Sequence, residues 1–115
     1  MQIEEHAFGD VVVLDLHGKM TAGDDLVQTR IQALVDGGAR YVLLNFSDVS
    51  YMDSVGLSTL VRSHMKLCQN GGRLALLHLP KRIVDLMTAS RLITVIEAFD
   101  DEAAAILGIK RSAAV

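Results

Sequence analysis

The chain has 115 residues, of which 50% are hydrophobic and 22% charged, a composition typical of one ordinary globular domain. Aromatic residues make up only 4%, so the core must consist mainly of Val, Leu, Ile and Met. The formal net charge is −3 and the basic residues are scattered along the sequence, which argues against nucleic-acid binding. The single cysteine, Cys68, excludes an intramolecular disulfide and any two-cysteine redox or zinc motif.

The sequence shows no basic and apolar leader segment, and no apolar run approaches the length of a membrane span. We therefore expect a cytoplasmic protein that does not insert into the bilayer. No repeat or linker-like segment interrupts the chain. We expect one domain over residues 1–110, followed by a short mobile tail at residues 111–115.

Apolar runs and turn residues divide the chain into alternating strands and helices. Short apolar segments bounded by turn residues predict strands at residues 2–6, 11–16, 41–46, 73–78 and 94–96. Apolar side chains at helical spacing predict helices at residues 26–35, 54–69, 80–89 and 101–107. A hairpin followed by this alternation is typical of an α/β fold with one mixed, mostly parallel sheet of about five strands flanked by helices.

Two of the predicted helices carry more detailed expectations. Asp24 and Asp25 should lie in the first turn of the first helix, where carboxylates complement the positive end of the dipole. In the second helix, the predicted core stripe consists of Leu57, Leu60, Val61, Met65 and Cys68. The opposite, solvent-facing side should carry Ser58, Thr59, Arg62, Ser63 and Lys66.

The loops that leave the carboxyl ends of parallel strands commonly form the functional edge of an α/β sheet. Here we expect a polar loop at residues 47–50, leading to Asp53 and to Ser54 at the start of a helix. Unpaired backbone N–H groups and the helix dipole accommodate a phosphate at such a position. The residues are equally consistent with an ordinary N-cap at Asp53 or Ser54 and a packing role for Gly56.

The run YMDSVGL at residues 51–57 resembles the signature of STAS-domain anti-sigma factor antagonists. The resemblance covers nearly the whole chain, including the early strand ending at Gly18, the Gly71-Gly72 turn and residues 86–92. In that family, the serine after the motif's aspartate is phosphorylated by a partner that is both serine kinase and anti-sigma factor. By position, the resemblance implies that Ser54 is the phosphoacceptor. It also implies a partner-binding surface formed by Thr21, Asp48, Tyr51, Met52, Asp53, Val55, Gly56, Ser58 and Arg62.

The function implied by the resemblance is a protein-binding switch rather than an enzyme. Unphosphorylated protein would sequester the anti-sigma factor, phosphorylation would release it, and a serine phosphatase would reset the switch. The resemblance implies no catalytic residue, no cofactor and no metal. An alternative within the same family is a constitutive scaffold subunit of a sensory or lipid-transport complex.

Three residues depart from the usual pattern of the family. Val55 stands where a serine or threonine usually follows the phosphoacceptor, and Thr21 stands where many members carry an aspartate that engages the kinase. Both departures favour a different partner or the scaffold role. Arg91 replaces a glycine that would allow a left-handed turn, so we expect that turn to be built differently.

Other chemistries find less support in the sequence. A serine hydrolase elbow needs a glycine two residues before the nucleophile, and Met52 stands there. No metal-ligand spacing relates the four histidines, which are His6, His17, His64 and His78. We expect these side chains to be solvated or hydrogen-bonded. A phosphoacceptor receiver domain needs an acidic cluster after its first strand, and residues 16–18 supply none.

Overall fold

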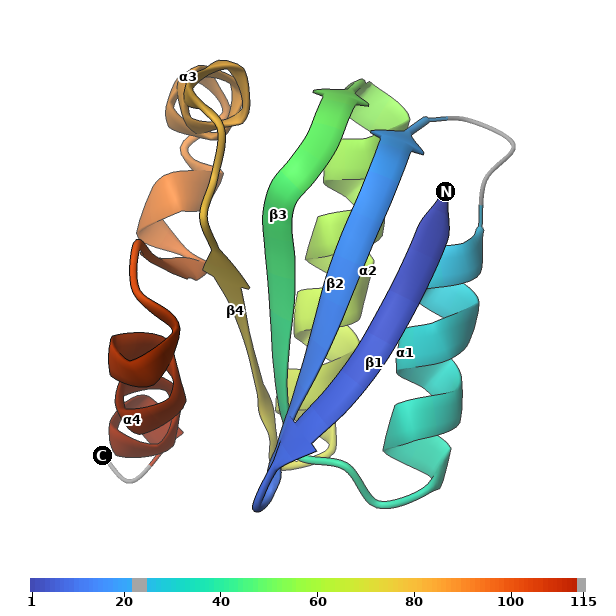
Figure 1. The fold of residues 1–115 in the computed structure, drawn as a ribbon, viewed down its shortest axis with the longest axis vertical. Helices are drawn as coiled ribbons and strands as arrows, with labels where there is room; N and C mark the ends of the chain where they lie inside the picture. The colour runs from blue at the N-terminus through green and yellow to red at the C-terminus, as the bar shows by residue number, and fades with distance from the viewer. Residues whose placement is uncertain (22–24, 114–115) are drawn as a thin grey trace.

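The computed structural model describes residues 1–21 and 25–113, in which one five-stranded sheet is flanked by four α-helices (Figure 1). The strands are β1 (Gln2–Phe8), β2 (Val11–Met20), β3 (Tyr41–Met52), β4 (Arg73–Leu77) and β5 (Glu97–Phe99). The helices are α1 (Leu26–Asp36), α2 (Ser54–Gln69), α3 (Lys81–Ala89) and α4 (Glu102–Ala113), with a short 3-10 helix, η1, at Leu92–Thr94. This order confirms the predicted alternation of strands and helices.

The strands lie side by side in the order β1-β2-β3-β4-β5. β1 pairs antiparallel with β2, and the other three pairings are parallel. The sheet is therefore mixed and mostly parallel, which confirms the predicted α/β fold. Because the carboxyl ends of parallel strands share one edge, the ends of β2 and β3 lie together, with Met20 and Met52 as register partners.

Helices cover both faces of the sheet (Figure 1). The larger core lies between the sheet and α1, α2 and α3, and it includes Leu14, Leu44 and Phe46 from the strands. A smaller core lies on the other face, where Ile109 of α4 packs with Val13 and its neighbours. The alternation of side chains along each strand assigns even-numbered residues of β2 to the first core and odd-numbered ones to the second.

β3 is longer than the sequence indicates, because it includes residues 47–50, the predicted polar loop. Ser47 and Ser50 are exposed, whereas Val49 is buried in the core and Met52 ends the strand. Two register shifts interrupt the pairing with β2 along this stretch. The polar residues are thus the exposed positions of an irregular strand, and such bulges are common beside functional sites.

The carboxyl-terminal part differs from the prediction in two places. Residues 92–94 form η1, held by a hydrogen bond of 2.7 Å from the Thr94 hydroxyl to the Arg91 carbonyl oxygen, and β5 begins only at Glu97. α4 continues to Ala113, because Ile109 is buried on the sheet and holds its second half there. The predicted domain boundary at residue 110 therefore falls within a helix, and residues 114–115 lie outside the described part.

The start of α1 also differs from the prediction. Asp25 is the N-cap residue rather than part of the first turn, and its side chain makes no capping hydrogen bond. Asp24 lies outside the described residues. On the predicted buried face, Val27 and Ile31 are buried and Leu34 is half-buried, so the orientation of this helix was predicted correctly.

The apolar stripe predicted for the core side of α2 is largely not buried. Leu60 is buried as predicted, but Leu57 and Val61 are only half-buried. Met65 is 51% exposed and Cys68 is exposed, so the interpretation of this cysteine as a core hydrophobe is wrong. Of the predicted stripe, only Leu60 is therefore fully buried, and Leu57 packs against the edge of the core.

The residues that α2 does bury include two that we assigned to its solvent face, Thr59 and Ser63. Gly56 lets the start of the helix approach the end of β2 closely, whereas Ser63 lines a small hollow between α2 and α1. The Thr59 hydroxyl donates a hydrogen bond of 3.2 Å to the Val55 carbonyl oxygen, so its burial leaves no unpaired hydroxyl there. The packed face of this helix therefore combines Gly56, Thr59 and Ser63 with two fully buried leucines, Leu60 and Leu67.

This face assignment is testable with two truncations on the same helix. Leu60→Ala should lower the free energy of unfolding by about 2–5 kcal/mol, because it leaves a cavity in the core. Met65→Ala should change it by less than about 0.5 kcal/mol, because the side chain is mainly in solvent. Urea denaturation measures both. Equal losses from the two variants would contradict the orientation of α2.

Arg91 adopts the left-handed backbone conformation, with φ of 63°, at the N-cap of η1. The turn is therefore built in the conformation that a glycine would adopt, and our expectation of a differently built turn is wrong. A side chain in this conformation is strained, because its Cβ approaches the following carbonyl oxygen.

Replacement of this residue by glycine should stabilise the protein. Arg91→Gly should raise the free energy of unfolding by roughly 1 kcal/mol, since relief of the left-handed strain outweighs the greater chain entropy of glycine. Arg91→Ala removes the same side chain but keeps Cβ, so it should give no such gain. A thermal melt in which both variants shift equally would show that the backbone conformation is not the cause.

Candidate functional site

Asp53 caps α2, and Ser54 occupies its first helical position. The Oδ1 atom of Asp53 accepts hydrogen bonds from the N–H groups of Val55 and Gly56, each at 3.0 Å. The backbone N–H of Asp53 donates to the Met20 carbonyl oxygen of β2 at 3.3 Å. The N-cap is therefore Asp53. We expected the N–H groups at this helix start to be free to bind a phosphate, but those of Val55 and Gly56 already bind the Asp53 carboxylate.

Gly56 allows the first turn of α2 to approach the end of β2. A Cβ atom at this position would lie 2.5 Å from the Met20 carbonyl oxygen and 2.5 Å from Met52 Cγ. Any side chain would force the helix start to move. Gly56 and Met52 are buried, so they position the site from within and offer little surface to a partner. Sequence patterns do not identify the role of Met20, because these contacts use its backbone oxygen.

Ser54 itself is exposed, and its hydroxyl has no hydrogen-bond partner among the described residues. Tyr51 and Val55, on either side of it in the sequence, are 47% and 45% exposed. Ser58 and Arg62 are exposed on the following turns, and the Ser58 hydroxyl donates to the Ser54 carbonyl oxygen at 3.1 Å. We call these five residues the Ser54 surface. Four of them belong to the predicted partner-binding set, and Ser54 is the predicted phosphoacceptor.

Thr21 and Asp48 have different positions relative to this surface. Thr21 follows β2 directly and is half-buried. It lies beside the start of α2, because the carbonyl oxygen of the preceding residue, Met20, accepts a hydrogen bond from the Asp53 N–H. Asp48 is held elsewhere: its Oδ2 atom lies 2.6 Å from His17 Nδ1. His17 is an odd-numbered residue of β2, on the sheet face opposite α2. The structure therefore does not bring Asp48 to Ser54.

A sequence model of the STAS domain matches residues 2–105. The chain belongs to the STAS domain family. The match covers the whole sheet, the first three helices and the Ser54 surface. No curated protein sequence matches the chain significantly.

Solved structures of similar fold include several anti-sigma factor antagonists. One from Mycobacterium paratuberculosis has a TM-score of 0.83 and 16% identity, over 95% of this chain and 93% of that one. An anti-sigma-factor antagonist STAS domain protein from Planctomyces limnophilus has a TM-score of 0.80 and 18% identity, over 94% and 97%. The Bacillus cell fate determinant SpoIIAA in its phosphorylated form has a TM-score of 0.70 and 22% identity, over 90% and 96%. At these identities the likeness establishes the fold.

On the face of the sheet opposite α2, His17 of the STAS domain lies between two carboxylates. Its Nδ1 atom makes the 2.6 Å hydrogen bond to Asp48. Its Nε2 atom lies 3.2 Å from Glu4 Oε1, but the angles of this contact are not those of a hydrogen bond. The hydrogen bond to Asp48 raises the pKa of His17 above its ordinary value, and the charges of Glu4 and Asp15 add to this effect. Burial acts in the opposite direction and does not reverse it.

The other histidines show no shared site. His6 lies 3.3 Å from Asp15 and 3.5 Å from Glu102, and burial lowers the pKa of His64. Within residues 1–21 and 25–113, no group of three His, Cys, Asp or Glu residues is arranged to hold a metal ion. In the same part of the chain, no helix is long and apolar enough to cross a membrane.

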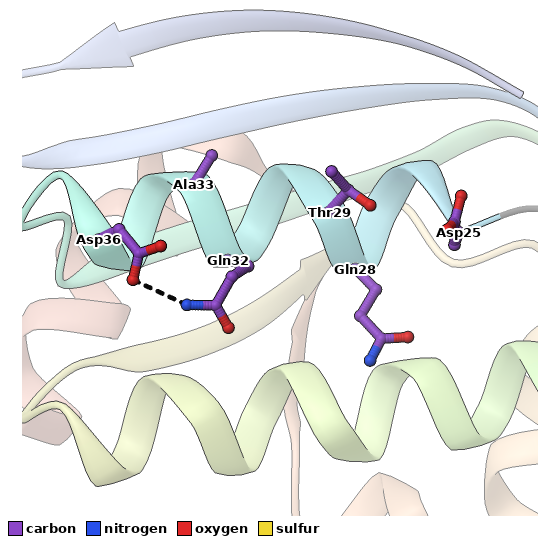
Figure 2. Close-up of a pocket in the computed structure, with 6 residues that line it drawn as sticks. All are labelled: Asp25, Gln28, Thr29, Gln32, Ala33 and Asp36. Carbon is purple, nitrogen blue, oxygen red and sulfur yellow. Dashed lines mark hydrogen bonds between the residues drawn. The ribbon is translucent and has the colours of Figure 1, made fainter.

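The outer side of α1 carries a polar hollow of about 560 Å³ (Figure 2). It is lined by Asp25, Gln28, Thr29, Gln32, Ala33 and Asp36. Gln32 donates a hydrogen bond of 2.8 Å to Asp36 within the same helix. All six residues belong to α1 or its N-cap, so this hollow is the surface between side chains of one helix and no enclosed binding site.

The environment of His17 predicts a measurable pH dependence. Its folded-state pKa should lie above the ordinary value of about 6.5, because the contact with Asp48 favours the protonated ring. The resulting stabilisation is fully present below about pH 6.5 and is lost as the pH rises through the raised pKa. NMR titration of the ring should show the raised pKa in wild type and a lower one in Asp48→Asn. In thermal melts, the advantage of wild type over His17→Gln should shrink with rising pH, and an advantage that grows would contradict this assignment.

Proposed function

We propose that this STAS domain is an anti-sigma factor antagonist whose partner binding is switched by phosphorylation of Ser54. The proposal is carried by one observation, the exposed and unbonded Ser54 hydroxyl at the first position of a helix capped by Asp53. A kinase can reach such a hydroxyl without local unfolding. The existence of a phosphorylated form of Bacillus SpoIIAA, a protein of the same fold, supports this proposal.

In the proposed cycle, the unphosphorylated domain binds an anti-sigma factor that is also a serine kinase, and so sequesters it in the cytoplasm. Phosphorylation of Ser54 by this kinase releases the domain, and a serine phosphatase restores the binding form. The domain contributes a binding surface and a phosphoacceptor, and no catalysis of its own. Among the described residues, no histidine contacts the Ser54 hydroxyl to act as a base, which disfavours the hydrolase alternative.

The size of the electrostatic effect is sufficient for a switch. A phosphate on Ser54 adds close to two negative charges. The N–H groups of Val55 and Gly56 are already bound to Asp53, so they do not neutralise the new charge. One unit-charge repulsion at about 4 Å is worth roughly 4 kcal/mol at the effective dielectric near a protein surface. A third of that value changes the affinity about tenfold.

The test compares two substitutions at the phosphoacceptor. The partner is first identified by pulldown with phosphosite mapping, and its affinity is then measured by calorimetry. Ser54→Ala should bind like wild type and resist phosphorylation, whereas Ser54→Asp should bind at least about tenfold more weakly. Because Asp53 and not Ser54 is the N-cap, both variants should keep the free energy of unfolding within about 0.5 kcal/mol of wild type.

A matched control places the same charge elsewhere. Ser47→Asp changes an exposed serine of β3 and should leave the affinity unchanged. If Ser54→Asp binds as tightly as Ser54→Ala at equal stability, the switch is refuted and the constitutive scaffold subunit takes its place. A phosphate mapped to Ser50 or Ser58 instead would retain a switch but remove Ser54 from its centre.

A further inference from the structure

α2 carries a row of apolar side chains that the domain buries only in part, although the first of them, Leu57, packs against the core. Leu57 and Val61 are half-buried, Met65 is 51% exposed and Cys68 is exposed. They are spaced four, four and three residues apart, so they form one row along the helix, roughly 16 Å long. Ser54 lies at the head of the same row, seven residues before Val61. We call the four apolar side chains the α2 stripe.

The α2 stripe borders a shallow groove of about 470 Å³ between α2 and the segment that joins α3 to η1. The groove is lined by Ser54, Leu57, Ser58, Val61, Arg62, Ser90 and Leu92. Its walls are thus partly apolar, and the serine proposed as phosphoacceptor is one of its lining residues. A groove along a helix accepts a convex, elongated element, and a second helix is the common occupant of such a groove.

The charged side chains that α2 carries beside the α2 stripe, Arg62 and Lys66, are both positive. α2 contains no aspartate or glutamate, and neither Arg62 nor Lys66 forms an ion pair within the described residues. Figure 2 shows Gln28 and Gln32 pointing from α1 toward α2, where they line a small hollow together with Arg62 and Lys66. Residues 54–96 contain six basic and one acidic side chain, whereas the rest of the chain contains five basic and thirteen acidic ones.

We propose that the α2 stripe is the docking site for an acidic, amphipathic helix of the partner protein. The apolar face of that helix packs against Val61 and Met65, and carboxylates on its flank pair with Arg62 and Lys66. This inference rests on the proposed function in one respect, because the partner is the protein that Ser54 controls. It adds the chemistry that the partner must present.

The charge and the shape of this region disfavour two other occupants. A second copy related by a two-fold axis would bring Arg62 and Lys66 toward their own equivalents, and like charges at an interface repel. An anionic membrane would satisfy the charge, but insertion into lipid needs several exposed apolar side chains, and Met65 is the only large exposed one in the α2 stripe. A protein helix satisfies both the charge and the shape.

The same geometry places the proposed phosphate in the path of the docked helix. Ser54 lies in line with the α2 stripe and lines the groove with Arg62. A phosphoserine there repels the carboxylates of the partner and competes with them for Arg62. Docking on the stripe therefore explains why a charge at Ser54 weakens binding, which a contact elsewhere on the domain would not.

The test uses photo-crosslinking in the cells that produce the protein. The photoreactive residue p-benzoylphenylalanine replaces Met65 in the full chain, and in a separate control it replaces Ala7, an exposed residue of β1. Crosslinked peptides are identified by mass spectrometry. The expected product at position 65 is one partner segment with apolar residues at helical spacing and acidic residues beside them. An adduct with a second copy of the chain, with lipid, or with a segment lacking this pattern overturns the proposal. A yield no higher than at position 7 overturns it as well.

Charge reversal tests the electrostatic part. The pair Arg62→Glu and Lys66→Glu should lower the crosslinking yield at least about tenfold, whereas Arg40→Glu, an exposed residue before β3, should not. Equal yields from these variants overturn the proposal.

The outcome for the docking site can be told apart from the outcome for the switch. If Ser54→Asp leaves the crosslinking yield unchanged while the charge reversals abolish it, the docking site stands and the phosphorylation switch fails. If Ser54→Asp weakens binding but no crosslink forms at position 65, the switch stands and the docking site fails.

Discussion

The geometry of the site depends on the contact between the start of α2 and the end of β2. At Gly56, a Cβ atom would meet the Met20 carbonyl oxygen and Met52 Cγ, so only glycine permits the observed approach. Asp53 completes the junction, because its backbone N–H bonds to Met20 while its carboxylate caps the helix. These contacts fix the first turn of α2 in place. They hold Ser54 at the exposed first position of the helix.

The capping role of Asp53 determines how a phosphate at Ser54 would act. Helix N-termini stabilise phosphates through free N–H groups and the dipole. Here the N–H groups of Val55 and Gly56 are bound to the Asp53 carboxylate, which also places a negative charge beside the phosphate. The dipole still favours the phosphorylated state, but local hydrogen bonds do not draw the phosphate into the domain. The charge of a phosphate there would therefore face outward, as the proposed change in partner affinity requires.

The order of strands and helices was predictable, because apolar runs and helical periodicity are local properties of the sequence. The position of the serine at a helix start was predicted for the same reason. Periodicity shows that Val61 and Met65 share a row, but it does not show whether that row faces the sheet or a partner. The buried row contains Thr59 and Ser63 beside Leu60 and Leu67, and the polarity of the first two had wrongly indicated a solvent-facing position. The placement of Asp48 likewise depends on the strand pairing of the longer β3, which no local pattern specifies.

The distribution of paired and unpaired charges connects the α2 stripe to the switch. Carboxylates on the strands are bonded within the domain, as Asp48 is to His17, whereas Arg62 and Lys66 have no ion-pair partner in the described part. The unpaired cations would attract the proposed acidic partner toward α2 before contact. A phosphate of almost two negative charges at Ser54 would nearly cancel these two positive charges, so it would remove the attraction in addition to repelling the proposed partner on contact. The lost attraction and the repulsion would both weaken partner binding, and added salt would reduce both. One modified side chain can therefore change the binding without any movement of the backbone.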